Sequence, residues 1–212
     1  MASREPSRVR GSKSNSRGDI RNTEAGMSKP LIEAIKREEA INIPRNTERV
    51  VVFDENGKVL GANTGREGEV AVPDNVSLRN TIVTHNHPTA EARRRYGDNL
   101  APRVGSTFSP ADVSLAVSRD VKEIRATTKG GYIYSLKRPA GGWGASPREV
   151  LYQMRQYQKE YRAKFSKKQL QKIYNKESDA SRVMPRYNVA SQHYAMKKLS
   201  AQYGWKYSYR KA

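Results

Sequence analysis

Two of the three histidines of this 212-residue chain stand two positions apart, within the segment 84–88 that reads Thr-His-Asn-His-Pro. The residues before them, 81–83, are β-branched and predict a strand, on which side chains two apart project from the same face. The imidazoles of His85 and His87 would then lie side by side at the end of that strand. Neutral imidazole binds zinc well, and a catalytic zinc ion takes three protein ligands and keeps one position open. The pattern predicts a metal site whose third ligand comes from elsewhere.

The segment 109–112 offers that third ligand. Ser109 has the chemistry of a helix N-cap, Pro110 suits the first helical position, and Asp112 falls in the first turn. The carboxylate of Asp112 is therefore predicted at the N-terminus of a helix, as the third metal ligand.

A carboxylate base is also required. Water that binds a zinc ion becomes acidic enough to ionise near neutral pH, but another group must take its proton. Glu48 opens the predicted strand 48–53 and is the preferred base. Glu67 and Glu69 also precede the histidine strand and stay open as alternatives.

A glutamate followed by His-x-His-Pro and then Ser-x-x-Asp resembles the JAMM motif of the JAB/MPN metalloproteases, and segments 84–88 and 108–112 are most similar to the RadC-type branch. The resemblance extends over roughly residues 47–138. It implies a JAB/MPN-like, cytidine deaminase-like fold and a zinc-dependent hydrolase of peptide or isopeptide bonds. In that family two histidines and an aspartate bind Zn²⁺, the glutamate is the general acid/base and the serine stabilises the oxyanion. These roles fall on His85, His87, Asp112, Glu48 and Ser109.

The surrounding elements predict an α+β domain over residues 29–140, with a mixed β-sheet flanked by helices. The long segment between His87 and Ser109 predicts an insertion that forms a lid or contacts substrate. The predicted elements are a helix over 29–40, a hairpin over 48–61, strands at 69–72 and 81–84, a helix from Ser109, and a second hairpin over 123–136.

Composition excludes several classes of site and of protein. The chain has no cysteine, which rules out disulfides, thiolate zinc sites, iron–sulfur clusters and a cysteine nucleophile. It contains no apolar run of the length that a membrane-spanning helix needs, and its first residues lack the apolar stretch of a signal peptide. We expect no membrane partner.

The net charge of +19 belongs mainly to the two ends of the chain. Residues 1–28 are predicted to be a flexible basic arm. Residues 147–212 hold sixteen basic residues, four acidic residues and nine tyrosines, and apolar spacing predicts a helix from about 151 to 165 and another over 189–203. Such an extension is typical of contact with nucleic acid or an acidic protein surface. The alternative is a solvated helical face with tyrosines packed on the core.

The ending Tyr203-Gly204-Trp205, joined to a JAB-like module, is similar to the ends of minor head or head-morphogenesis proteins of tailed bacteriophages. This second resemblance implies a role in the virion head or its assembly, with capsid or portal proteins as partners. The protein would then be found in the host cytoplasm during assembly or in the virion. The alternative to the enzyme is a non-enzymatic phage structural or internal head protein that binds DNA or capsid partners through its basic ends. A third possibility is a RadC-like factor associated with nucleic acid.

Overall fold

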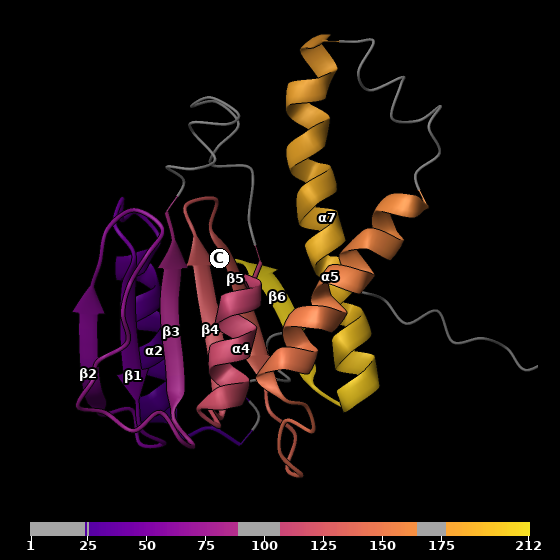
Figure 1. Cartoon of the computed structure of the whole chain (residues 1–212). Helices are drawn as coiled ribbons and strands as arrows, with labels where there is room; N and C mark the ends of the chain where they lie inside the picture. The colour runs from indigo at the N-terminus through magenta and orange to yellow at the C-terminus, as the bar shows by residue number, and fades with distance from the viewer. Residues whose placement is uncertain (1–23, 25, 89–106, 165–176) are drawn as a thin grey trace, which may run out of the picture.

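The computed structural model describes residue 24 and residues 26–88, 107–164 and 177–212. Most of the predicted N-terminal arm and of the predicted lid lies outside these residues. Over the described residues the chain is a mixed α+β structure with a six-stranded sheet and four helices (Figure 1). The elements are α2 (Lys29–Asn42), β1 (Arg49–Phe53), β2 (Val59–Thr64), β3 (Ile82–His87), α4 (Pro110–Ser118), β4 (Glu123–Thr128), β5 (Tyr132–Lys137), α5 (Pro147–Ala163), α7 (Glu177–Tyr203) and β6 (Lys206–Lys211).

The strand order is β2-β1-β3-β4-β5-β6; among these six described strands, β3 and β4 pair in parallel and the other neighbours are antiparallel. A parallel pair needs a crossover connection, and α4 lies within it. The crossover brings the start of α4 back to the end of β3, where the two histidines stand. The register pairs His85 with Ala126 and Thr84 with Arg125.

The two faces of the sheet are covered by different helices. On one face, α2 packs Leu31 and Ile35 against Val51, Phe53 and Ile82. On the other face, α4, α5 and α7 cover a larger core (Figure 1). Because successive strand residues alternate between faces, His85 and His87 project toward the α4 side while Thr84 and Asn86 project toward α2.

The N-terminal half follows the predicted pattern with one exception. The predicted helix 29–40 and hairpin 48–61 are confirmed as α2 and as β1 with β2. The turn between the strands is closed by Asp54, whose Oδ1 accepts the N–H groups of Asn56 and Lys58. The predicted strand at 69–72 is wrong, because this region forms only one isolated bridge, between Arg66 and Glu69, and otherwise runs as loop.

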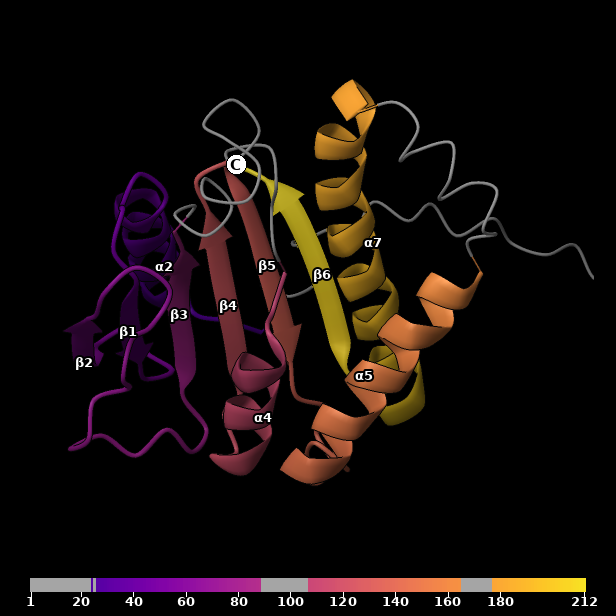
Figure 2. The same cartoon turned by 45° about the horizontal axis from the view of Figure 1, so that its top comes forward.

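The C-terminal segment contains both predicted helices and a strand that the sequence did not predict. Gly204 follows the last residue of α7 and has a φ of 72°, a left-handed conformation that ends the helix. The chain then forms β6, which pairs with β5 at the edge of the sheet (Figure 2). Trp205 packs edge-on against Trp143, with ring centroids 5.1 Å apart, and its Nε1 donates to the carbonyl of Trp143 at 2.7 Å. The aromatic residues of the Tyr-Gly-Trp ending thus make packing contacts within this chain. None of the helices in the described ranges is long and apolar enough to cross a membrane.

Candidate metal centre

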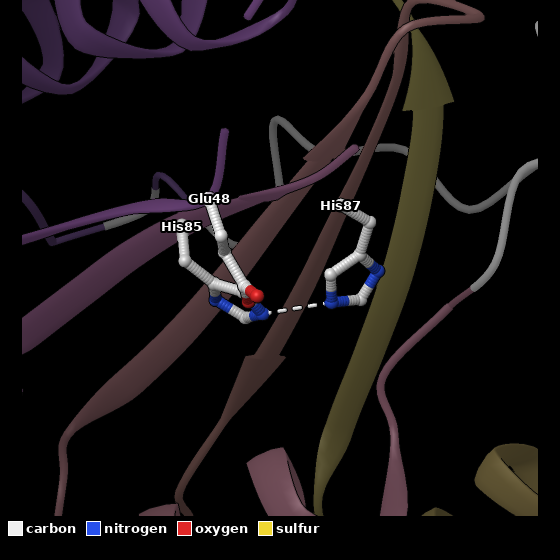
Figure 3. A group of neighbouring side chains, drawn as sticks. All are labelled: Glu48, His85 and His87. Carbon is white, nitrogen blue, oxygen red and sulfur yellow. Dashed lines mark hydrogen bonds between the residues drawn. The ribbon is translucent and has the colours of Figure 1, made fainter. Parts of the chain in front are cut away.

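The two imidazoles stand at the carboxyl end of β3 and meet there. The Nε2 atoms of His85 and His87 lie 2.8 Å apart (Figure 3). His85 is buried and His87 is half-buried. The spacing of two along a strand, which puts both rings on one face, is therefore realised as two nitrogen donors aimed at a common point.

Asp112 approaches the same point from the first turn of α4. Its two carboxylate oxygens each lie 3.4 Å from one imidazole Nε2, Oδ1 from His85 and Oδ2 from His87. Asp112 also closes a capping box, because Oδ2 accepts the N–H of Ser109 at 2.6 Å. One carboxylate therefore fixes the helix start and faces both histidines.

Glu48 completes the cluster from the residue before β1. The antiparallel register pairs Val50 with His85, so continuing it by two residues places Glu48 opposite His87. Glu48 is 8% exposed, and its carboxylate and the two imidazoles offer ligand atoms that lie within 4.8 Å of one another (Figure 3). This group of three could hold a metal ion; Asp112, the predicted third ligand, does not belong to it, although its carboxylate faces both histidines.

The alternative bases lie differently. Glu67 and Glu69 are both exposed, in the loop after β2, and neither belongs to the group that could hold a metal. Of the three candidate glutamates, Glu48 is the one whose carboxylate meets the histidines.

Asn86 holds the Glu48 segment, a role that the sequence analysis missed. Its side chain points away from the imidazoles, where Oδ1 accepts the N–H of Arg49 at 2.7 Å and Nδ2 donates to the carbonyl of Thr47 at 3.0 Å. These two bonds bracket Glu48 and tie it to the strand that carries both histidines. The signal was present in the sequence: a polar residue inside a buried strand must find partners on the opposite face.

Ser109 lies at the N-cap of α4, where its Oγ accepts the N–H of Asp112 at 3.1 Å. The predicted N-cap is thus confirmed. The accepted bond uses an oxygen lone pair and leaves the hydroxyl proton for another acceptor.

Side chains of the C-terminal segment contact the residues just before the start of α4. The Tyr207 hydroxyl bridges Thr107 Oγ1 at 2.9 Å and His193 Nδ1 at 2.7 Å. Phe108, fully buried, packs edge-on against the rings of Tyr134 and Tyr207. The segment that leads into Ser109 and Asp112 is therefore fixed by α7 and β6. His193 packs among these rings, and it does not belong to the group that could hold a metal ion in the described part of the chain.

The pKa values of the two carboxylates are shifted in opposite directions. Burial would raise the pKa of Asp112, but the charges and hydrogen bonds of His85 and His87 outweigh it and hold that pKa well below its usual range. Burial raises the pKa of Glu48, an effect that the same two histidines only partly offset. Of the two carboxylates, Asp112 therefore ionises more readily and Glu48 takes a proton more readily.

The cluster lacks a fixed positive charge. Among the residues that the structure describes, no lysine or arginine forms an ion pair with Glu48 or Asp112. Histidine is neutral when it ligates a metal, so two imidazoles and two carboxylates would offer a cation a largely buried set of nitrogen and oxygen ligands.

In comparisons with known proteins, no protein-family model, curated protein or solved structure matches the chain.

Proposed function

We propose that the protein is a zinc-dependent hydrolase of the JAMM type, acting on a peptide or isopeptide bond. The observation that carries the proposal is a convergence of side chains: Glu48, just before β1, groups with His85 and His87 of β3, and Asp112 of α4 faces both histidines. These residues come from three separate parts of the chain, and each has a type suited to one step of metal-assisted hydrolysis.

The donor set fits zinc. Two imidazole nitrogens and one carboxylate oxygen are ligands that catalytic zinc sites use, and the site lacks any thiolate, which the cysteine-free sequence could not supply. His85, His87 and Asp112 would hold the ion, with Glu48 beside it. Zinc bound there would supply Lewis acidity, which acidifies water and polarises a carbonyl.

The residues of the chain would then move the proton and stabilise charge. Glu48 has a raised pKa and lies beside the metal ligands, so it can accept the proton of the attacking water and return it to the departing amine as the C–N bond breaks. The Ser109 hydroxyl proton and the N-terminus of α4 provide positive polarity for the developing oxyanion.

The same observations support a JAB/MPN-like core. The order of the motif residues along the chain agrees with that family, and α4 follows the histidine strand in the crossover to β4. The predicted roles in a virion head, with capsid or portal proteins as partners, stay predictions that concern assembly and not this chemistry.

Hydrolysis tests the proposal. The zinc-loaded chain is incubated with a mixture of protein-derived peptides and with isopeptide-linked protein conjugates, and new termini are detected by mass spectrometry. Glu48→Gln keeps the shape of the side chain but removes the base, so it should bind zinc and lose at least about a hundredfold of the cleavage rate. Glu67→Gln is the matched control and should cleave as the wild type does.

Two results would contradict the proposal. Cleavage that persists in Glu48→Gln would remove this residue from the mechanism. A wild-type chain that binds zinc and cleaves none of these substrates would favour the non-enzymatic alternative, in which the cluster is a structural metal site.

A further inference from the structure

A stripe of exposed cations runs along the outer face of α5, away from the metal centre. Its members follow one another at steps of four, three, four and three residues, the spacing that keeps side chains on one face of a helix. All are exposed to solvent, and the single aromatic among them, Tyr152, is 59% exposed. The α5 stripe consists of Arg148, Tyr152, Arg155, Lys159 and Arg162.

The stripe is held on a rigid support. Ser146 and Glu149 close a capping box at the start of α5, and the opposite face of the helix buries Val150 and Met154. The helix packs against both α4 and α7 (Figure 1). From first to last residue the stripe spans about 21 Å at a rise of 1.5 Å per residue.

The cations of the stripe have no acidic partner among the residues that the structure describes. Both acids of α5 are engaged elsewhere: Glu149 accepts the N–H of Ser146 at 2.7 Å, and Glu160 accepts from Tyr194 at 2.5 Å and from Lys164 at 2.9 Å. No ion pair or hydrogen bond to another described residue involves the stripe's four cationic side chains. Four exposed positive charges in a line, unpaired within the described ranges, form a surface complementary to a linear polyanion.

We infer that the α5 stripe binds a single-stranded nucleic acid. Cations repeated along a straight helix match a backbone of evenly spaced phosphates, to which each contributes a contact that releases counterions. Tyr152 stands within the row of cations with its ring open to solvent, where an unpaired base can stack on it. An acidic protein segment would use the charges but would give Tyr152 no base on which to stack.

The test measures the salt dependence of binding to a fluorescently labelled oligothymidylate by anisotropy. Each phosphate contact on a single strand contributes about 0.7 to the slope of log K against log salt, so four contacts contribute about 3. Replacing the four cations by glutamine (R148Q, R155Q, K159Q and R162Q together) should reduce the slope by that amount. The matched control removes four exposed cations from other elements (K29Q, R37Q, K58Q and R119Q together) and should keep most of it.

Tyr152→Ala separates stacking from charge. It should weaken binding to the single strand about tenfold, leave the salt slope unchanged, and have little effect on a duplex of the same length. Circular dichroism of each variant checks that α5 is intact. His87→Ala should bind the oligonucleotide as the wild type does, because the stripe is separate from the metal centre.

Three results would overturn the inference. Equal loss of slope in the control variant would show a dependence on net charge alone. If the four-cation variant binds the oligonucleotide as the wild type does, the stripe is not the binding surface. If the four-cation variant loses binding to polyglutamate but still binds the oligonucleotide, the partner of the stripe is an acidic protein.

Discussion

The sheet carries a cluster of buried charge on each face, and the two clusters neutralise that charge differently. On the α2 face, Arg125 donates from Nε to Glu39 and from Nη1 to Glu123, both at 2.6 Å, and all three side chains are at most 2% exposed. On the α4 face of the same strands, two carboxylates meet two imidazoles, and no guanidinium from the described part of the chain pairs with them. The first cluster contains its own cation, whereas the second does not.

The difference shows how a buried charged site can be structural or functional. Burial alone would lower the pKa of Arg125, but Glu39 and Glu123 raise it, so the guanidinium stays charged. A permanently charged side chain closes that cluster to any other cation. Histidine is neutral when it ligates a metal, so the cluster around His85 and His87 keeps a place for an ion from solution.

Removing the built-in cation should have the largest effect on stability. Arg125→Met leaves two buried carboxylates without a neutralising cation, and the free energy of unfolding should fall by about 3–5 kcal/mol, measured by urea denaturation. Combining it with Glu39→Met and Glu123→Leu should recover much of the loss, since no buried charge is left. If Arg125→Met lowers the free energy of unfolding by less than about 1 kcal/mol, Arg125 is not what neutralises the two carboxylates.

Supplying a cation to the second cluster should have the next largest effect. Zinc at a hundred times its dissociation constant should raise the free energy of unfolding of the wild type by about 2.7 kcal/mol, because it binds the folded state. The same zinc concentration should not stabilise His87→Ala. Equal stabilisation of both chains would place the ion elsewhere.

Acid should weaken the packing behind the metal centre through His193. Burial, with a smaller contribution from Lys197, lowers the pKa of His193 from 6.5 to about 4, so between these pH values the unfolded chain binds a proton that the folded chain does not. Stability from this group is complete above pH 6.5 and is lost as the pH falls toward 4. Between pH 7 and pH 5 the loss should be at most roughly 2 kcal/mol.

The comparison for this prediction is His193→Asn, which cannot titrate but keeps an acceptor near the position of Nδ1. Its unfolding free energy should fall less steeply between pH 7 and pH 5 than that of the wild type. Parallel pH profiles for the two chains would contradict the lowered pKa.

The smallest effect is expected from the Tyr207 hydroxyl. Tyr207→Phe keeps the ring but removes its bonds to Thr107 and His193, and should lower the free energy of unfolding by about 1 kcal/mol. In a double-mutant cycle with Thr107→Val, the two losses should not add, because they remove the same hydrogen bond. Full additivity would show that the two hydroxyls do not interact.

Local chemistry made much of the site predictable. The alternation of a strand placed His85 and His87 together, and the Ser109-Pro110 sequence fixed the start of α4 and so the position of Asp112. Glu48 could be preferred but not separated from Glu67 and Glu69, since only the register between β1 and β3 brings it opposite His87.

Long-range packing was beyond the reach of the sequence. The residues of β6, Lys206–Lys211, are three basic residues, two tyrosines and a serine, a composition that resembles a charged tail. Pairing with β5 makes them a strand. Arg125 and Glu39 are 86 positions apart, and no pattern in the sequence around either residue predicts that the two form a buried ion pair. The predicted strand at 69–72 failed because its apolar residues pack as a loop against the core instead of joining the sheet.

Zinc stoichiometry tests the central claim most directly. The metal-free chain is titrated with zinc by isothermal calorimetry, and the number of bound ions is read by native mass spectrometry. His85→Ala, His87→Ala and the control His193→Asn are measured in the same way. We predict one ion per chain in the wild type and in His193→Asn, and none held by the other two variants. A folded wild type that binds no zinc, or histidine variants that bind it equally well, would contradict the metal centre.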